Sequence, residues 1–265
     1  MRYSGIQPQY FPRLHYFARI LATDVFMIRD DVQFVLKHKY PDGKVDKSYQ
    51  AHTPIKQAFG HQLLGLQIKH GSFLPIIQTK ISYEHDWVEN HLKTLLLVYS
   101  KANNSNSIYT QIEKILTKKY KDLASLNIAT ISWGLLQLLG KKEEPSLEVV
   151  NSILKQQKTF RLKEIRRASE SKALKQNGEM DANEKIIALC SEVGAKEDYC
   201  GGTGLAAYVN HDLFAENGIK ITVQDWKCQE YPQLYNKQAG FIPNLSIIDL
   251  LMNVDHKTAV KIING

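Results

Sequence analysis

The chain has 265 residues, of which 43% are hydrophobic and 23% charged, and a formal net charge of +7. This balance is typical of a globular protein with a sizeable core, and it excludes a collagen-like or largely disordered chain. No apolar run could cross a bilayer, no apolar leader opens the chain, and the three cysteines form no Cys-x-x-Cys pair, so we expect a cytoplasmic protein with free thiols, no membrane span and no metal site.

The first 34 residues predict a strand, a loop, a helix and a second strand. Residues 1–6 form the first strand, and Pro12 fits the first turn of the helix, where its missing N–H is no loss. Apolar residues then repeat at helical spacing: Leu14, Phe17, Ile20 and Leu21. Residues 25–28 are apolar throughout, as in a strand covered on both faces. Two strands joined by one helix are most simply parallel, with a right-handed crossover.

The middle of the chain predicts less regular structure. Residues 35–80 contain short strand candidates, of which we expect at least one to return into the main sheet. Residues 84–140 are mostly helical, and the polar run 103–107 is expected to cap the second helix. Residues 141–180 carry many basic and few large apolar side chains, which predicts a basic helical insertion or linker.

From residue 183 the pattern again predicts alternating helices and strands. We expect, in order, a helix ending at Gly194, a strand at 198–200, a glycine-rich turn, a helix ending at Gly218, a strand at 219–226 and a helix capped by Ser246. The predicted fold class is therefore α/β, with a Rossmann-like, mainly parallel sheet flanked by helices and with a helical accessory region. Residues 1–140 would form its N-terminal half together with the helical region, and residues 181–265 would complete the same domain.

Two polar groups near the N-terminus are candidates for chemistry. Two prolines hold the loop from Gln7 to Pro12, where Gln7 offers a donor and an acceptor and the following helix start offers free N–H groups. Asp30 and Asp31 follow the second strand. Because they are adjacent, their side chains point in opposite directions and cannot share a proton. One could hold a substrate amine or act as a general base. For the loop, a structural β–α connection is the simpler explanation; for the two aspartates, a solvated strand end is an equally good one.

Further candidates come later in the chain. The turn from Gly201 through Gly202 and Thr203 to Gly204, with Tyr208, could bind phosphate through backbone N–H groups, although it lacks the P-loop and dinucleotide patterns, and a tight turn is the simpler explanation. Lone histidines such as His52 and His91 are more often core residues, and Cys200 has no partner base for a nucleophilic role. The basic stretch 155–175 contains one aromatic residue, so a solvated or docking face is favoured over nucleic acid.

Several blocks of the sequence, taken together and in this order, resemble the WbqC-like family of bacterial surface-polysaccharide and related biosynthetic loci. The blocks are Gln7-Pro8-Gln9-Tyr10-Phe11-Pro12, Asp30-Asp31-Val32-Gln33-Phe34, Thr53-Pro54-Ile55-Lys56, the helix with Trp87, His91 and Tyr99, Tyr199 to Gly204 with Tyr208, Tyr231-Pro232-Gln233-Leu234, and Phe241 to Asn253. The resemblance covers residues 1–140 and 180–265. The chain departs from the family pattern at Ile6, His15 and Cys200, and the Asn-Arg pair expected after the second block is absent.

The resemblance implies a biosynthetic enzyme, a transferase of N-acyltransferase type that moves an acyl or aminoacyl group to an amine, plausibly an amino sugar. The alternatives are a nucleotide-dependent activating enzyme and a non-enzymatic module that binds nucleic acid or an acidic carrier protein through its basic segment. We expect a small-molecule substrate, such as a nucleotide-linked sugar or a carrier-bound acyl donor; the sequence assigns no cofactor.

The site is expected where Gln7, Asp31 and Gly202 converge, beyond the carboxyl ends of neighbouring parallel strands. The catalytic candidates are Asp30, Asp31 and His52. The substrate-binding candidates are Gln7, Tyr10, Gln33, Lys56, Gly201, Gly202, Thr203, Gly204, Tyr208 and Gln233.

Overall fold

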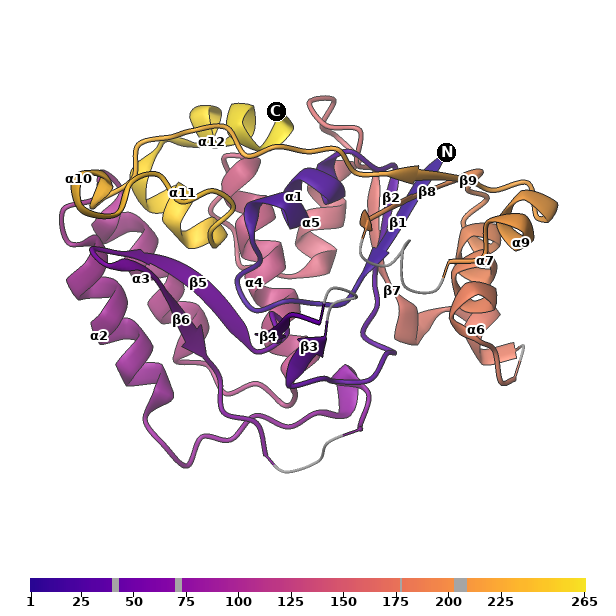
Figure 1. Ribbon diagram of the computed structural model, residues 1–265, viewed down its shortest axis with the longest axis horizontal. Coiled ribbons are helices and arrows are strands. Elements are labelled where there is room, and N and C mark those ends of the chain that lie inside the picture. Colours follow the sequence, from indigo (N-terminus) through magenta and orange to yellow (C-terminus); the bar gives the residue numbers. More distant parts are fainter. Residues whose placement is uncertain (40–42, 70–72, 177, 203–208) are drawn as a thin grey trace.

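The computed structural model describes residues 1–39, 43–69, 73–176, 178–202 and 209–265. Its centre is a sheet of five strands, all parallel, in the order β7-β2-β1-β8-β9 (Figure 1). The strands are β1 (Arg2–Ile6), β2 (Val25–Ile28), β7 (Glu164–Arg167), β8 (Glu197–Cys200) and β9 (Lys220–Val223). This confirms the predicted α/β class and the parallel pairing of the first two strands.

Helices cover both faces of the sheet (Figure 1). The helices of the first face and of the region beyond it are α1 (Leu14–Leu21), α2 (Trp87–Tyr99), α3 (Ser105–Leu116), α4 (Leu123–Leu138), α5 (Leu147–Leu154), α10 (Asn236–Ala239), α11 (Ile247–Asn253) and α12 (His256–Asn264). The helices of the second face are α6 (Lys172–Gln176), α7 (Ala182–Glu192) and α9 (His211–Glu216). Two short 3₁₀ turns complete the helical elements of the described residues, η1 (Ile76–Gln78) and η2 (Ala168–Glu170).

Alternation along β1 and β2 divides the core into two clusters. Phe26 and Ile28 of β2 face the larger cluster, which α1 and α4 help to fill. Tyr3, Val25 and Met27 face the smaller cluster beneath α7 and α9. Because strand side chains alternate between faces, a strand buried on both sides must be apolar throughout, as β2 is.

Residues 35–80 differ from the prediction, because no described strand of this region joins the main sheet. They form two separate hairpins, β3 (Lys37–Lys39) with β4 (Val45–Lys47) and β5 (His52–Gln57) with β6 (Gly60–Gly65). The second hairpin contributes Ile55 and Leu64 to the larger core cluster, so helices and not sheet neighbours cover its apolar side.

The basic segment also differs from the prediction of a helical insertion or linker. It contains α5 and α6, but it also supplies β7, the edge strand of the main sheet beside β2. Only Ile165 among the four β7 residues is buried, and the charged residues form ion pairs: Arg166 with Glu164, and Arg167 with Asp30. An edge strand with one apolar residue carries too little pattern to be recognised.

Helix ends agree with the sequence in part. Gly194 and Gly218 follow α7 and α9 with left-handed φ values of +69° and +65°, as expected after a helix. The hydroxyl of Ser246 accepts a hydrogen bond from the Ile248 N–H, which caps α11. Asn104 makes no side-chain cap on α3; its amide group instead donates to backbone carbonyls at the end of α11 and just beyond it.

Candidate functional site

The order of the strands creates a crevice at the carboxyl end of the sheet. From β1 the chain continues outward to β2 and β7 on one side, and later to β8 and β9 on the other. Helices therefore leave β1 and β8 toward opposite faces, which opens the crevice where ligands of such sheets bind. A cavity of about 410 Å³ lies there. Its lining includes Tyr3, Gly5, Ile6, Gln7, Arg19, Arg29, Val32, Ile186, Asp198, Cys200, Gly201 and Val209.

Tyr3 places a phenol hydroxyl at the floor of the crevice. The side chain is 1% exposed and runs along β1 over Gly5, where an added Cβ would lie 2.4 Å from the hydroxyl oxygen. Gly5 therefore provides the room for this ring. The hydroxyl has no hydrogen-bond partner among the described residues, and burial raises the pKa of Tyr3 well above its usual range. A buried hydroxyl without a partner is costly, and a ligand in the crevice would relieve that cost.

Asp198 of β8 lies on the same face, next to Tyr3 across the strand pair. Its side chain is 4% exposed and accepts no hydrogen bond from any described residue. Burial raises the pKa of Asp198 to about 7, although Arg19 and Arg29 act in the opposite direction. A carboxyl group with this pKa can both accept and donate a proton near neutral pH.

Arg19 reaches the crevice from the last turn of α1. Its Nε donates to Oε1 of Gln224 at 2.8 Å, and the Gln224 amide donates to the backbone of His15, which fixes the plane of the guanidinium. Gly201 permits this approach, because an added Cβ would lie 2.7 Å from Nη2 of Arg19. The terminal nitrogens of Arg19 have no hydrogen-bond partner within the part of the chain that the structure describes.

Arg29 follows β2 and carries the second guanidinium. Its Nε and Nη2 donate to the two oxygens of Asp31 at 2.8 and 3.0 Å, in a bidentate ion pair. The carboxylate of Asp31 thus neutralises most of the Arg29 charge and orients its side chain over Gly5. Cys200 also lines the cavity, but burial raises the pKa of its thiol to about 11, which keeps it protonated at neutral pH.

The structure brings some of the residues proposed from sequence to this crevice. Gln7 and Gly201 line it, and Asp31 reaches it through Arg29. Gly202 follows directly and is exposed. Thr203, Gly204 and Tyr208 lie outside the described residues.

Asp30 lies in a closed network on the other side of β2. It is fully buried, and its oxygens accept hydrogen bonds from the Arg167 guanidinium and from the N–H and hydroxyl of Ser169 at 2.8–2.9 Å. These bonds tie β2 to β7 and to η2. Each carboxylate oxygen is therefore already engaged by the protein.

Three other candidates lie away from the crevice cavity. Tyr10 is buried, with its hydroxyl 3.1 Å from Nδ1 of His91. His52 contacts the Ser48 carbonyl through Nδ1 at 3.0 Å, and burial lowers its pKa. Gln33 is exposed and bridges to Pro75 at the backbone.

Lys56 and Gln233 meet in a buried network beside α10 and α11, at the opposite end of the molecule from β8 and β9 (Figure 1). Lys56 is fully buried; its Nζ donates to Oε1 of Gln233 at 3.0 Å and also to the Gly240 carbonyl. Asp249 accepts hydrogen bonds from two tyrosines, Tyr99 and Tyr231, at 2.8 Å each. This network joins β5, α2, α11 and the C-terminal segment, which is a structural role.

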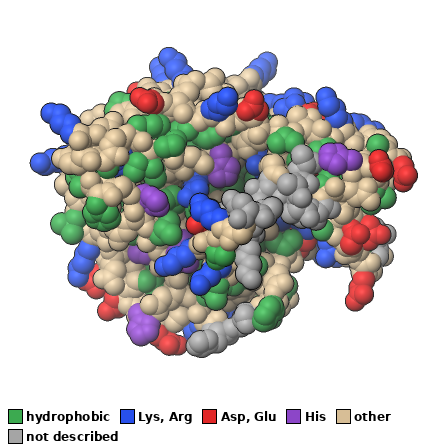
Figure 2. All heavy atoms as spheres, viewed as in Figure 1, with side chains coloured by type: hydrophobic (Ala, Val, Ile, Leu, Met, Phe, Trp, Pro, Cys, Tyr) green, Lys and Arg blue, Asp and Glu red, His purple; other side chains and the backbone are tan. Residues whose placement is uncertain are grey.

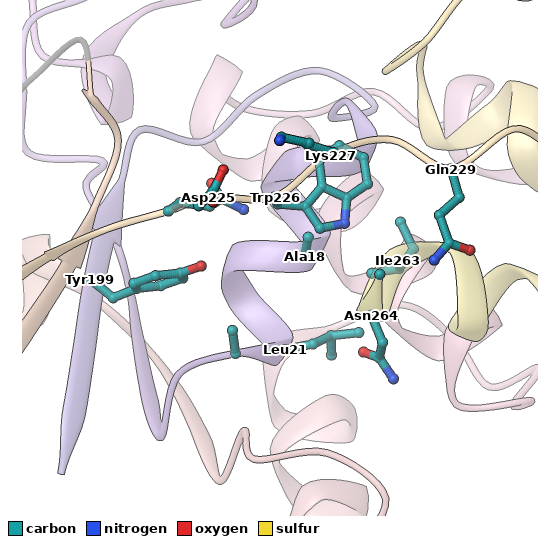
Figure 3. A pocket seen from close by; sticks show the side chains of 12 residues that line it. Ala18, Leu21, Tyr199, Asp225, Trp226, Lys227, Gln229, Ile263 and Asn264 are labelled. Carbon is teal, nitrogen blue, oxygen red and sulfur yellow. The ribbon is translucent and has the colours of Figure 1, made fainter.

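Two other cavities are at least as large as the crevice cavity. One, of about 500 Å³, is bounded by the rings of Tyr199 and Trp226, with Ala18 and Leu21 of α1 beneath them and Asn264 of α12 beside them (Figure 3). The other, of about 420 Å³, lies by the β3–β4 hairpin. Its lining is Arg13, Lys44, Asp46, Lys47, Tyr49, His61 and Leu63. Figure 2, which has the same view as Figure 1, shows Lys and Arg side chains gathered in the central part of the visible face of the molecule.

Four residues of the crevice were not proposed from the sequence: Tyr3, Arg19, Arg29 and Asp198. Weak signals were present for each. Asp198 is a charged residue inside a strand next to a glycine turn, and Tyr3 stands two residues from Gly5 on one strand face. Arg19 interrupts the apolar pattern of α1, and Arg29 directly precedes the aspartate pair. None of these signals distinguishes a site residue from an ordinary surface charge without the fold.

Among the described residues, no three His, Cys, Asp or Glu side chains cluster as a metal ion would require. Within the same ranges, no helix is long and apolar enough to cross a membrane.

Comparison with known proteins finds one family model, described as the WbqC-like protein family, that matches residues 7–261. The uncharacterized protein Rv1507c of Mycobacterium tuberculosis is 26% identical over 251 residues, which are 94% of this chain and 92% of that protein. No solved structure matches the chain.

Proposed function

We propose that this chain, which belongs to the WbqC-like protein family, is a transferase that moves an acyl or aminoacyl group from an activated donor to an amine. Asp198 is the proposed proton acceptor. Neither the family description nor the name of the relative states a reaction, so the proposal rests on the crevice itself. The single observation that carries this proposal is the buried carboxyl of Asp198, which faces the cavity beside two guanidinium groups.

The reaction needs a proton acceptor, a group that stabilises the oxyanion and groups that orient the reactants, and the crevice has side chains for each of these roles. An amine at neutral pH is mostly an ammonium ion, so it must lose a proton before it can attack. Asp198 can accept that proton because burial raises its pKa to about 7. The guanidinium of Arg19, which lines the same cavity, can stabilise the oxyanion that develops on the donor carbonyl. Gln7 and the Tyr3 hydroxyl supply further hydrogen bonds for orientation.

In the proposed reaction the attacking nitrogen loses two protons and forms one bond to the donor carbonyl carbon. The ammonium transfers one proton to the Asp198 carboxylate, and the neutral nitrogen forms a bond to the carbonyl carbon of an acyl ester or thioester. The tetrahedral oxyanion collapses and breaks the bond between this carbon and the leaving group. Asp198 returns its proton to the leaving group, and the second proton of the attacking nitrogen passes to water. The products are an amide and a free alcohol or thiol.

The test is amide formation measured by mass spectrometry, with acyl and aminoacyl thioesters and esters as donors and a panel of amines as acceptors. Asp198→Asn is expected to lower the rate at least ~100-fold, within the range that general base catalysis contributes. Asp212→Asn, a change to an exposed aspartate on α9, serves as the matched control and should keep the wild-type rate. Full activity of the Asp198→Asn variant contradicts the assignment.

Nucleotide-dependent activation is the second candidate, because the cavity lies at the switch point of a parallel sheet, where such sheets bind nucleotides. This candidate predicts release of pyrophosphate from ATP in the same assay mixtures. The basic segment offers less support for a nucleic-acid module, since Arg161 and Lys163 pair with Asp24 and Arg166 pairs with Glu164.

A further inference from the structure

The crevice holds separated charges of both signs that sum to about zero. Arg29 and Asp31 neutralise each other in their bidentate pair. Arg19 then contributes one positive charge, and Asp198 contributes one negative charge when it is ionised. A surface of this kind is complementary to a ligand that carries one negative and one positive group a short distance apart.

Arg19 presents the geometry that a carboxylate requires. Its Nε is occupied by Gln224, whereas no described residue is hydrogen-bonded to its two terminal nitrogens, and Arg19 lines the cavity. Two parallel N–H groups on one edge of a guanidinium match the two oxygens of a carboxylate. An added Cβ at Gly201 would lie 2.7 Å from Nη2, so the glycine keeps the space beside these nitrogens free of a side chain.

The same surroundings disfavour a phosphate dianion. Asp198 lies in the same cavity, and a doubly charged group bound at Arg19 would be repelled by its carboxylate. Arg29 offers little compensating charge, since Asp31 is already paired with it through two hydrogen bonds. A monoanionic carboxylate is the better match.

We propose, as an inference that rests on the proposed function, that the acceptor amine carries a carboxylate on the same molecule: Arg19 binds the carboxylate, and Asp198 faces the amine. Binding of the carboxylate fixes the position of the nitrogen next to its proton acceptor, which lowers the entropic cost of the reaction. Two kinds of molecule share this chemistry, α-amino acids and amino sugars oxidised to uronic acids.

The experiment is direct binding to the full chain, by calorimetry and thermal shift, and needs no turnover. One arm uses the standard α-amino acids, with the amide and the N-acetyl derivative of each that binds. The other arm uses 2-amino-2-deoxyglucuronic acid, with glucosamine as its counterpart without a carboxylate. At least one zwitterion should bind, at least ~10-fold more tightly than its blocked counterparts, which corresponds to ~1.4 kcal/mol. The arm that responds identifies the kind of acceptor.

Variants locate the site. Arg19→Gln should weaken the zwitterion at least ~10-fold but leave the amide derivative or glucosamine unaffected, and Arg19→Lys should restore part of the loss because it keeps the charge without the planar edge. Arg166→Gln, which changes a half-buried arginine of β7 outside the crevice, should have no effect. If both Arg19 variants fail to fold, the comparison of blocked and unblocked ligands on the wild-type protein still decides.

Three results overturn the inference: no zwitterion binds, the carboxylate-free counterparts bind as tightly, or inorganic phosphate binds in their place. The outcome is separable from the fate of the proposed function. Amide formation from amines without a carboxylate would refute this inference and leave the transferase intact. Binding of a zwitterion without any transfer would refute the transferase.

Discussion

Replacing Asp198 by Asn should make the protein inactive and, above neutral pH, more stable. Asn has nearly the same shape as Asp but carries no charge at any pH. In the wild-type protein the carboxyl is 4% exposed and is held beneath the crevice without a hydrogen bond from the described residues. Its ionised form is therefore costly to bury, and the variant removes that cost.

The magnitude follows from the pKa. At about 1.4 kcal/mol per pH unit, the difference between the raised pKa of about 7 and the ordinary value of 3.8 corresponds to about 4 kcal/mol. Between these two values the folded protein holds the proton more tightly than the unfolded chain, so the free energy of unfolding falls as the pH rises. The whole loss is present above pH 7 and disappears below pH 3.8.

The assay is denaturant unfolding of the wild-type protein and Asp198→Asn at pH 4 and pH 8. We expect the variant to be more stable by about 2–4 kcal/mol at pH 8, or by ~5–10 °C in melting temperature, and nearly equal to wild type at pH 4. Asp212→Asn should change the free energy of unfolding by less than ~0.5 kcal/mol at both pH values. The reasoning would be refuted if the difference in unfolding free energy between the variant and the wild type were the same at pH 4 and pH 8, or if the variant were less stable than the wild type at pH 8.

Three further predictions concern other parts of the molecule. Gly201→Ala should displace Arg19 and weaken binding of a carboxylate ligand about tenfold in a calorimetric titration, whereas Gly202→Ala, whose added Cβ would meet its nearest atom at 3.9 Å, should not. Lys56→Met should lower the free energy of unfolding by about 2–5 kcal/mol in a denaturant titration, because it leaves buried oxygens without a donor; an unchanged value would contradict the network. Burial lowers the pKa of His91 to about 4, so His91 contributes a loss of stability as the pH drops from 6.5 toward 4, opposite in sign to the contribution of Asp198; His91→Gln should remove this loss, and equal slopes for the variant and the wild type would exclude it.

The local sequence pattern determines the central strands. The four apolar residues 25–28 form β2 with the predicted bounds, and residues 2–6 form β1. Both lie in the middle of the sheet, and in β2 burial on two faces leaves a continuous run of apolar residues. The edge strand β7 was not predicted, because its outer side needs no apolar residues and three of its four residues carry charge.

The candidate site was predicted in position but not in its residues. Parallel strands that end in polar loops predicted a crevice with Gln7 and the glycine turn, and the cavity between β1 and β8 includes Gln7 and Gly201. The pair Asp30 and Asp31 was proposed together, yet the two side chains have different surroundings: one binds Arg167 and Ser169, and the other orients Arg29. The roles of the two carboxylates could not be distinguished from the sequence, because the partners of Asp30 come from a distant part of the chain.

The sequence by itself determined the α/β class, the buried strands and the end of the sheet at which polar groups collect, because these depend on periodicity within short segments. Only the tertiary structure decided that Asp198 is a buried acid, since its pKa depends on burial in the fold and on Arg19 and Arg29 from the N-terminal part of the chain. Burial and the distances between charged groups are set by the folded structure, and the spacing of residues along the chain does not specify them.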